Sequence, residues 1–205
     1  MEKSILKNKN IMLLWTGQLI SHAGDSIYMI ALPWLILDLT GSKSTTSLTI
    51  MSGYLPSILF GLIAGTFADK YSRKMVMMMS DILRSIFVLL VPISLIMGLT
   101  SPVLIGVITF IVATLATPFY PARDSLIPDI VPQNQLASAN SIISTSGQMA
   151  HLLGPFLAGV LVSIVGITHL FTIDALSFSA SLICISFLKI PRKENYERTQ
   201  QSHSE

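Results

Sequence analysis

The first long apolar run of the chain carries polar side chains three and four residues apart. They are Gln18, Ser21, His22, Asp25 and Tyr28, and this spacing places them along one stripe of a helix. A charged group near the centre of a hydrocarbon layer costs about 2.5–3.5 kcal/mol, so Asp25 is expected to face water or protein. Because removal from bulk water favours the neutral form of a carboxyl group, we predict that Asp25 binds and releases a proton, which His22 can share. Gln18, Ser21 and Tyr28 are predicted to line a cavity for a small molecule. The alternative is that Asp25 only forms a hydrogen bond to another helix.

The third apolar run contains two opposite charges, Asp81 and Arg84, three residues apart and hence on one helical face. Such charges can neutralise each other inside a membrane, so we predict an intramembrane ion pair with a structural role. A functional alternative is that this pair exchanges partners with Asp25 or with Asp69. Asp174 ranks below Asp25 as a functional acid, because a position near the start of the last run is expected to be easier to hydrate.

The composition predicts that these residues belong to an integral membrane protein. Hydrophobic residues make up 51% of the chain and charged residues only 12%, far from the averages of soluble domains. Six apolar runs approach or exceed the roughly 20 residues that a helix needs to cross hydrocarbon. They are residues 11–37, 45–68, 75–97, 102–120, 137–165 and 169–188. Continuous runs oppose the short alternating strands of a membrane β-barrel. The predicted fold is therefore an all-α bundle of six transmembrane helices over residues 11–188.

The basic residues orient this predicted bundle. Of the 13 Lys and Arg residues, all but two fall on one side of the membrane; Lys43 lies opposite and Arg84 lies within a span. The positive-inside rule then predicts a multi-pass protein of the cell (cytoplasmic) membrane with both termini in the cytoplasm. Residues 1–10 are predicted to be a cytoplasmic N-terminus, and residues 189–205 a polar cytoplasmic tail. Membrane insertion explains the basic residues, so we predict no nucleic-acid partner.

A short charged turn separates the second and third runs. It reads Gly65-Thr-Phe-Ala-Asp69-Lys-Tyr-Ser-Arg73-Lys74, and its basic residues are expected to anchor a tight hairpin at the cytoplasmic surface. Asp69 is expected to pair with a cation or to cap a helix N-terminus. The pattern resembles the Gly-x-x-x-Asp-x-x-x-Arg-Lys signature between the second and third helices of the major facilitator superfamily, with Ser72 in place of the usual second glycine. The resemblance implies that Gly65, Asp69, Arg73 and Lys74 form a motif that gates conformational change. The alternative is a generic basic anchor.

The fifth run holds small residues at which another helix can approach closely, and a proline that bends the helix axis. They are Gly147, Gly154, Pro155 and Gly159. This set resembles the Gly-Pro antiporter motif in the fifth helix of the superfamily, with Ala158 where the family often has a further glycine. Ordinary close packing of helices explains the same residues equally well.

Further segments resemble one branch of the superfamily, the macrolide-efflux and siderophore exporters. They are 17–21, 24–25, 31–34, 119–132, 139–141 and 173–178, in the same order across nearly the whole chain. We predict that the segment at 119–132, with its three prolines, forms a structured interfacial elbow. The run at 102–120 has no arginine where many drug antiporters carry one, and Arg123 is expected at its end. Asp25 with His22 is therefore predicted to carry the proton coupling.

The resemblance implies efflux of hydrophobic drug-like or macrolide-like molecules by proton antiport and alternating access. Six helices would form two inverted three-helix repeats. Family members have two six-helix halves, so this chain is expected to supply the N-terminal half. The implied partners are membrane lipid, a hydrophobic small-molecule substrate, protons and a second half-bundle, either another copy or a separate chain.

Three other functional classes compete with a transporter. A truncated membrane protein that does not transport, or that serves as an assembly partner, fits the chain length but not the intact motifs. A channel would conduct ions independently of the proton gradient. An enzyme is not predicted, because the chain has no nucleotide-binding loop, no metal-ligand spacing and no nucleophile elbow, so no cofactor and no metal are expected.

Overall fold

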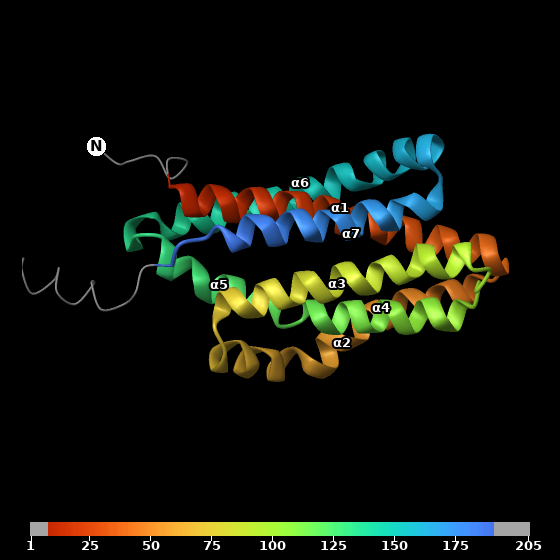
Figure 1. The fold of residues 1–205 in the computed structure, drawn as a ribbon, viewed down its shortest axis with the longest axis horizontal. Coiled ribbons are helices and arrows are strands. Elements are labelled where there is room, and N and C mark those ends of the chain that lie inside the picture. Colours follow the sequence, from red (N-terminus) through yellow and green to blue (C-terminus); the bar gives the residue numbers. More distant parts are fainter. Residues whose placement is uncertain (1–7, 191–205) are drawn as a thin grey trace, which may run out of the picture.

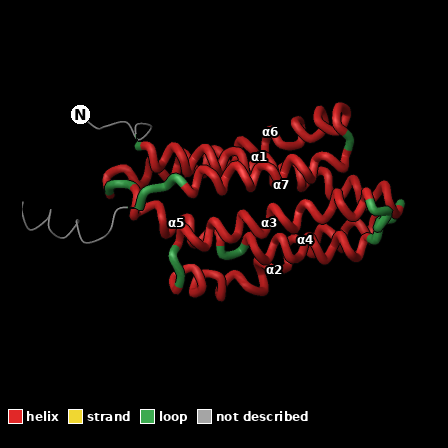
Figure 2. The backbone as a smooth tube through the Cα atoms, in the orientation of Figure 1, coloured by secondary structure: helices red, strands yellow, loops and turns green. Residues whose placement is uncertain are grey.

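The computed structural model describes residues 8–190, except for the side chains of residues 67–69. Helices account for almost all of this segment (Figures 1 and 2). They are α1 (Lys9–Thr40), α2 (Lys43–Lys70), α3 (Arg73–Ile96), α4 (Pro102–Ala116), α5 (Phe119–Ile130), the 3-10 turn η2 (Gln133–Gln135), α6 (Leu136–Val165) and α7 (Ile167–Ser186). The predicted all-α fold is confirmed.

Six helical segments in the described part of the chain are long and apolar enough to cross a membrane. They are Lys9–Thr40, Lys43–Thr66, Arg73–Ile96, Pro102–Ile130, Gln133–Val165 and Ile167–Ser186. Their number and order are those predicted from the apolar runs. The fourth span differs in extent, because it consists of α4 and α5 joined at Thr117 and Pro118 and extends to Ile130.

Helix α5 replaces the interfacial elbow that the prolines at 119–132 predicted. Pro118 is the N-cap residue of α5 and Pro121 lies in its first turn, where the backbone N–H groups have no partner within the helix and a proline removes nothing. The residues Phe119, Ala122 and Leu126 recur at helical spacing and are buried. Pro128 lies inside α5, two residues before its end, and the helix continues through it. The elbow prediction was therefore wrong, because Pro118 and Pro121 start the helix and Pro128 lies close to its last residue.

Helices α1, α3 and α7 form the centre of the bundle. Helix α1 packs against α6 and α7, α3 packs against α7, α4 and α5, and α2 packs mainly against α4 (Figure 1). Two apolar clusters fill the interior. One contains Ile27, Leu35, Val88, Phe171 and Phe178, and the other contains Ile11, Leu14, Met77, Phe119 and Leu126. Along α1 and α3, the residues between the two clusters include buried polar side chains, which form the layer described below.

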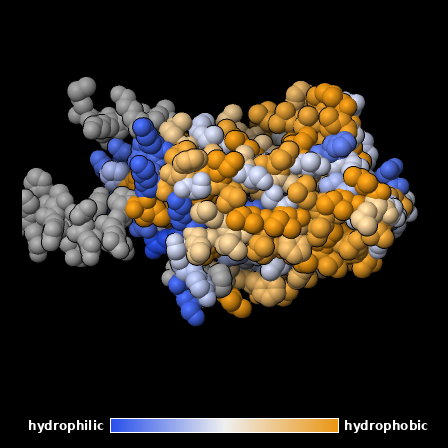
Figure 3. Space-filling model, viewed as in Figure 1, coloured by the Kyte–Doolittle hydropathy of each residue, from blue (hydrophilic) through white to orange (hydrophobic). Residues whose placement is uncertain are grey.

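The surface of the bundle is apolar along its length. Figure 3 shows hydrophobic side chains over the middle and hydrophilic ones gathered most densely at the end where α1 begins and α7 ends. The two described chain ends lie together there, since the Asn10 side chain donates a hydrogen bond to the Lys189 carbonyl at 2.7 Å. An even number of spans requires this arrangement. The cytoplasmic location of residues 1–10 and 189–205 stays a prediction, and most of both segments lies outside the described residues.

Candidate functional site

A cavity of about 400 Å³ lies among helices α1 to α6. Much of its wall is apolar, but seven titratable side chains from five helices also line it. They are His22, Asp25 and Tyr28 of α1, Tyr54 of α2, Arg84 of α3, Tyr120 of α5 and His151 of α6. The cavity therefore joins an apolar chamber to a cluster of ionisable groups.

An ion pair between α1 and α3 forms part of the cavity wall. Arg84 Nη2 lies 2.6 Å from Asp25 Oδ1, and the guanidinium carbon lies 3.8 Å from the centre of the Phe178 ring. The Arg84 side chain is 4% exposed, whereas that of Asp25 is 24% exposed. A charged hydrogen bond and a cation–π contact both stabilise a guanidinium in a dry site. The pair is thus buried at the arginine and accessible at the carboxylate.

The predicted pair of Asp81 and Arg84 is the longer of the two contacts that Arg84 makes with carboxylates. Arg84 Nη1 lies 4.0 Å from Asp81 Oδ1, beyond hydrogen-bond distance. Sequence reasoning raised Asp25 only as an exchange partner for this pair. In the structure Asp25 is the closer partner, because α1 and α3 both face the cavity.

Asp174 lies near the same arginine from α7 and is 1% exposed. The prediction that it would be easy to hydrate was wrong. A Cβ atom at Gly24 would lie 2.6 Å from Asp174 Oδ1 and 2.1 Å from Ser177 Oγ, so α1 approaches α7 more closely than any other residue would permit. This close approach excludes water from Asp174.

The two histidines line the cavity together with Tyr120. The His22 and Tyr120 rings are stacked with centroids 6.5 Å apart and an angle of 11° between their planes. No direct hydrogen bond joins His22 to Asp25 in the described part of the chain, so a proton shared between them would pass through water in the cavity. Sequence reasoning missed Tyr120 and His151 as site residues. The sequence did offer a signal for His151: it lies four residues after Gly147 and therefore on the same face of the fifth predicted helix.

Only one of the three predicted cavity residues lines this cavity. Tyr28 does so, and its hydroxyl oxygen lies 2.9 Å from Thr109 Oγ1. Gln18 and Ser21 are buried between helices. Gln18 Oε1 accepts a hydrogen bond from Arg123 Nη1 at 3.3 Å. Arg123, expected at the end of the fourth span, instead lies within it on α5, with its guanidinium 5.2 Å from the Tyr120 ring.

The basic residues of the charged turn fasten the start of α3 to two other helices. Arg73 forms an ion pair with Asp129 of α5 and donates a hydrogen bond to the Ser125 carbonyl at 2.7 Å. Lys74 donates to the carbonyls of Ser186 and Leu188, at 2.7 and 2.8 Å, and so caps the end of α7.

The other two residues of the predicted gating motif, Gly65 and Asp69, make no close contact that the structure describes. The side chain of Asp69 lies outside the described part of the chain. A Cβ atom at Gly65 would meet nothing within 4 Å, so no helix packs closely there. The gating role of Gly65, Asp69, Arg73 and Lys74 remains a proposal.

The glycines of the fifth run differ in their surroundings on α6. A Cβ atom at Gly154 would lie 2.2 Å from Ser26 Cβ of α1, whereas one at Gly147 would lie 3.6 Å from the His22 ring. Gly159 has open space, with nothing within 4 Å of an added Cβ. Pro155 lies inside the helix, one residue after the closest contact. Only the Gly154 position therefore demands a glycine for packing.

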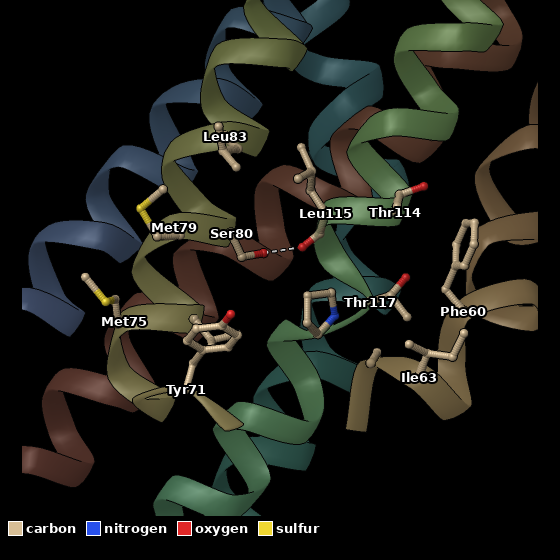
Figure 4. A pocket seen from close by; sticks show the side chains of 13 residues that line it. Phe60, Ile63, Tyr71, Met75, Met79, Ser80, Leu83, Thr114, Leu115 and Thr117 are labelled. Carbon is tan, nitrogen blue, oxygen red and sulfur yellow. Dashed lines mark hydrogen bonds between the residues drawn. The ribbon is translucent and has the colours of Figure 1, made fainter. Parts of the chain in front are cut away.

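A second cavity, of about 470 Å³, lies among α2, α3 and α4 (Figure 4). Its lining includes Phe60, Ile63, Met75, Met79 and Leu115 and contains no charged side chain. Ser80 donates a hydrogen bond to the Leu115 carbonyl at 2.5 Å across one wall, as the dashed line in Figure 4 marks. This cavity offers apolar contact but no Asp, Glu, His, Lys or Arg side chain for coupling. Among the described residues, no group of three or more His, Cys, Asp or Glu side chains is arranged to hold a metal ion.

Comparison with known proteins places these features in a family. A family model described as transmembrane secretion effector matches residues 3–201. The multidrug efflux pump Tap of Mycolicibacterium fortuitum is 30% identical over 191 residues, which are 90% of this chain and 46% of that protein. An uncharacterized MFS-type transporter of Bacillus subtilis, YfiS, is 30% identical over 190 residues, covering 92% of this chain and 44% of that protein.

A third relative is macrolide efflux protein A of Streptococcus pyogenes. It is 26% identical over 181 residues, covering 87% of this chain and 44% of that protein. The chain spans about half the length of the curated relatives it matches. The matching family is one of transporters and not of enzymes. With six spans and a family match over nearly its whole length, the chain belongs to the transmembrane secretion effector family of the major facilitator superfamily of transporters.

Proposed function

We propose that the chain supplies the N-terminal half of a transporter that exports hydrophobic small molecules by proton antiport and alternating access. One observation carries this proposal. The cavity of about 400 Å³ has an apolar chamber with the Asp25–Arg84 ion pair in its wall. A transporter of this kind needs a substrate chamber and a proton-binding group whose occupancies affect each other. Here the candidate proton-binding group, Asp25, lines the candidate substrate chamber.

The shape and chemistry of the cavity support a hydrophobic substrate. Its volume falls within the range of about 300–1,000 Å³ that is usual for small-molecule sites. Tyr28, Tyr54 and Tyr120 line it, together with aliphatic side chains, and aromatic rings give large contact areas at low entropic cost. The names of two relatives, a multidrug efflux pump and a macrolide efflux protein, make drug-like or macrolide-like molecules the proposed substrate class.

The position of Asp25 supports a coupling role for this residue. A proton arriving at Asp25 removes the negative charge that holds Arg84 at 2.6 Å. The freed arginine then requires another partner, because an unpaired cation is strongly disfavoured in a dry environment. Protonation of Asp25 thus changes the contact between α1 and α3. His22 relays the proton through cavity water.

The exposed apolar faces of α2 and α6 support a second half-bundle on the open side of the cavity. Leu62 of α2 is 93% exposed, and Leu152 of α6 is 77% exposed. Both helices also line the cavity, through residues such as Tyr54 and His151. A second half-bundle would close the chamber, and the turn with Asp69 would contact it during the conformational cycle. That half is a further part of a longer polypeptide, a second copy or a separate chain.

The test is the accumulation of hydrophobic antibiotics in cells that express this chain, alone and with a relative's missing half. We expect reduced accumulation that a proton uncoupler restores, and no reduction for Asp25→Asn at equal membrane content. Export that survives the uncoupler, or that persists in Asp25→Asn, would contradict proton antiport through Asp25.

We also propose a second candidate function, in which the exposed apolar faces of α2 and α6 bind another membrane protein. In that case the chain is an assembly partner that does not itself transport. Antibiotic accumulation that is unchanged with the chain alone, but falls when a relative's missing half is also expressed, would indicate that the chain transports only together with that half. Unchanged accumulation in both settings, with insertion verified, would favour the assembly partner.

A further inference from the structure

We propose that Asp81 and Ser181 form a second proton-binding site between α3 and α7, which exchanges charge with Asp25 through Arg84. Its ligand is a proton, held on the Asp81 carboxyl group in the conformation seen here. This inference rests on the proposed proton antiport and adds to it the group that holds a proton while Asp25 is ionised.

The site consists of buried polar groups whose hydrogen-bonding capacity is unused. Asp81 and Ser181 are both 0% exposed. Neither carboxyl oxygen of Asp81 nor the hydroxyl oxygen of Ser181 has a partner at full hydrogen-bond distance in the described part of the chain, although Ser181 lies near enough to Asp81 to interact with its carboxyl group. Buried polar groups in native proteins are almost always paired. Such a concentration of unpaired groups therefore indicates that a small ligand completes the site.

A proton satisfies these groups better than a metal cation does. A protonated Asp81 becomes a donor, and Ser181 Oγ is available as its acceptor. An ionised Asp81 would have only the Ser181 hydroxyl as a donor, because the nearest guanidinium nitrogen is 4.0 Å away. A second cation beside Arg84 would meet its repulsion in a medium of low dielectric constant.

The charges around Arg84 agree with a neutral Asp81. The titratable groups that face this region are His22 and Asp25 of α1, Asp81 itself, Tyr120 of α5 and Asp174 of α7. Arg84 supplies one positive charge and forms its close contact with Asp25. One ionised carboxylate therefore neutralises the cluster, whereas ionised Asp81 and Asp174 would leave buried charge without compensation.

The geometry also shows how Arg84 can change partners without leaving the site. Its two terminal nitrogens already point to different acids, Nη2 to Asp25 and Nη1 to Asp81, while Nε has no hydrogen-bond partner among the described residues. When Asp81 loses its proton, its carboxylate attracts Arg84, and Asp25 takes up a proton from the cavity. The total charge of the three groups is the same before and after. One proton leaves and one arrives, so the exchange couples the α3–α7 contact to the cavity.

Infrared spectroscopy of the full chain in lipid nanodiscs tests this site without requiring transport. We expect a carbonyl band from a protonated, buried carboxyl group at neutral pH, and loss of that band in Asp81→Asn. Ser181→Ala should shift the same band to higher frequency, because it removes the hydrogen-bond acceptor. Asp174→Asn is the matched control, since Asp174 is equally buried on α7 but has the Ser177 hydroxyl 3.4 Å from its carboxyl group. This variant should leave the Asp81 band in place.

Two results would overturn the inference. One is a spectrum at neutral pH in which Asp81→Asn removes no protonated-carboxyl band, and the other is a Ser181→Ala variant with an unshifted band. Asparagine has the shape of the neutral acid, so Asp81→Asn should fold; if it does not, Ser181→Ala alone decides. Failure of the export assay with the Asp81 band present would contradict the proposed antiport and not this site.

Discussion

The crossing of α1 and α6 at Gly154 permits a quantitative test of the packing. An alanine there would place its Cβ atom 2.2 Å from Ser26 Cβ, whereas ordinary contacts begin at 3.4 Å. The two helices would have to separate by about 1 Å, or Ser26 would have to move. Overpacking of this kind costs about 1–3 kcal/mol. For a chain of this length that corresponds to a fall of roughly 2–12 °C in the melting temperature.

Gly159→Ala is the matched control on the same helix. An added Cβ atom there meets nothing within 4 Å, and alanine is a better helix former than glycine by about 1 kcal/mol. We therefore expect Gly159→Ala to leave the melting temperature unchanged or to raise it slightly. The opposite signs of the two substitutions separate steric overlap from any general effect of removing glycine from α6.

A second substitution should rescue Gly154→Ala. Ser26→Gly removes the Cβ and Oγ atoms, which lie 2.2 and 3.2 Å from the new methyl group, and leaves Ser26 Cα at 3.3 Å. By itself Ser26→Gly should destabilise the chain by about 0.5–1 kcal/mol, because it places a glycine within a helix. In the double variant we expect the two costs to be less than additive.

Thermal unfolding in nanodiscs, followed by circular dichroism, gives the melting temperatures of the unsubstituted chain and of the four variants. Equal melting temperatures for Gly154→Ala and Gly159→Ala would refute the close crossing. Strict additivity in the double variant would refute the assignment of the overlap to Ser26.

Three further predictions concern proton coupling, gating and the ion pair between α3 and α5. Asp25→Asn should reduce uncoupler-sensitive export to the level of a vector control while membrane insertion stays normal, measured by antibiotic accumulation and membrane content; export at the wild-type level would contradict the coupling role. Asp69→Asn should slow export without weakening substrate binding, measured by equilibrium binding to membranes, and equal losses of both would contradict a gating role. Arg73→Glu and Asp129→Arg should each lower thermal stability, and the combined charge swap should recover part of the loss, because the two side chains form an ion pair between α3 and α5. If the double variant is no more stable than the single variants predict, the Arg73–Asp129 ion pair contributes little to thermal stability.

Local composition was sufficient to predict the spans. Membrane insertion depends on the summed hydrophobicity of about 20 consecutive residues, a property that can be read without knowing what the helix packs against. The number and order of the spans, and membership in a transporter superfamily, were therefore accessible from the apolar runs and the Gly65 to Lys74 motif. The 119–132 segment was misjudged because three prolines outweighed its helical spacing of apolar residues, which tertiary packing of α5 then favoured.

The partners of the buried charges could be decided only by the tertiary structure. The spacing of Asp81 and Arg84 correctly put both on one face of α3, but an arginine side chain is long enough to reach a neighbouring helix. It forms its close contact with Asp25 of α1, because both side chains reach into the wall of the same cavity. Asp174 is dry because Gly24 brings α1 against α7. The sequence by itself determined which apolar runs enter the membrane, since that is a property of a single helix, but it placed Arg123 at the end of the fourth span and not within it. Which acid holds the arginine, and which is left to hold a proton, depends on distances between helices that are far apart along the chain.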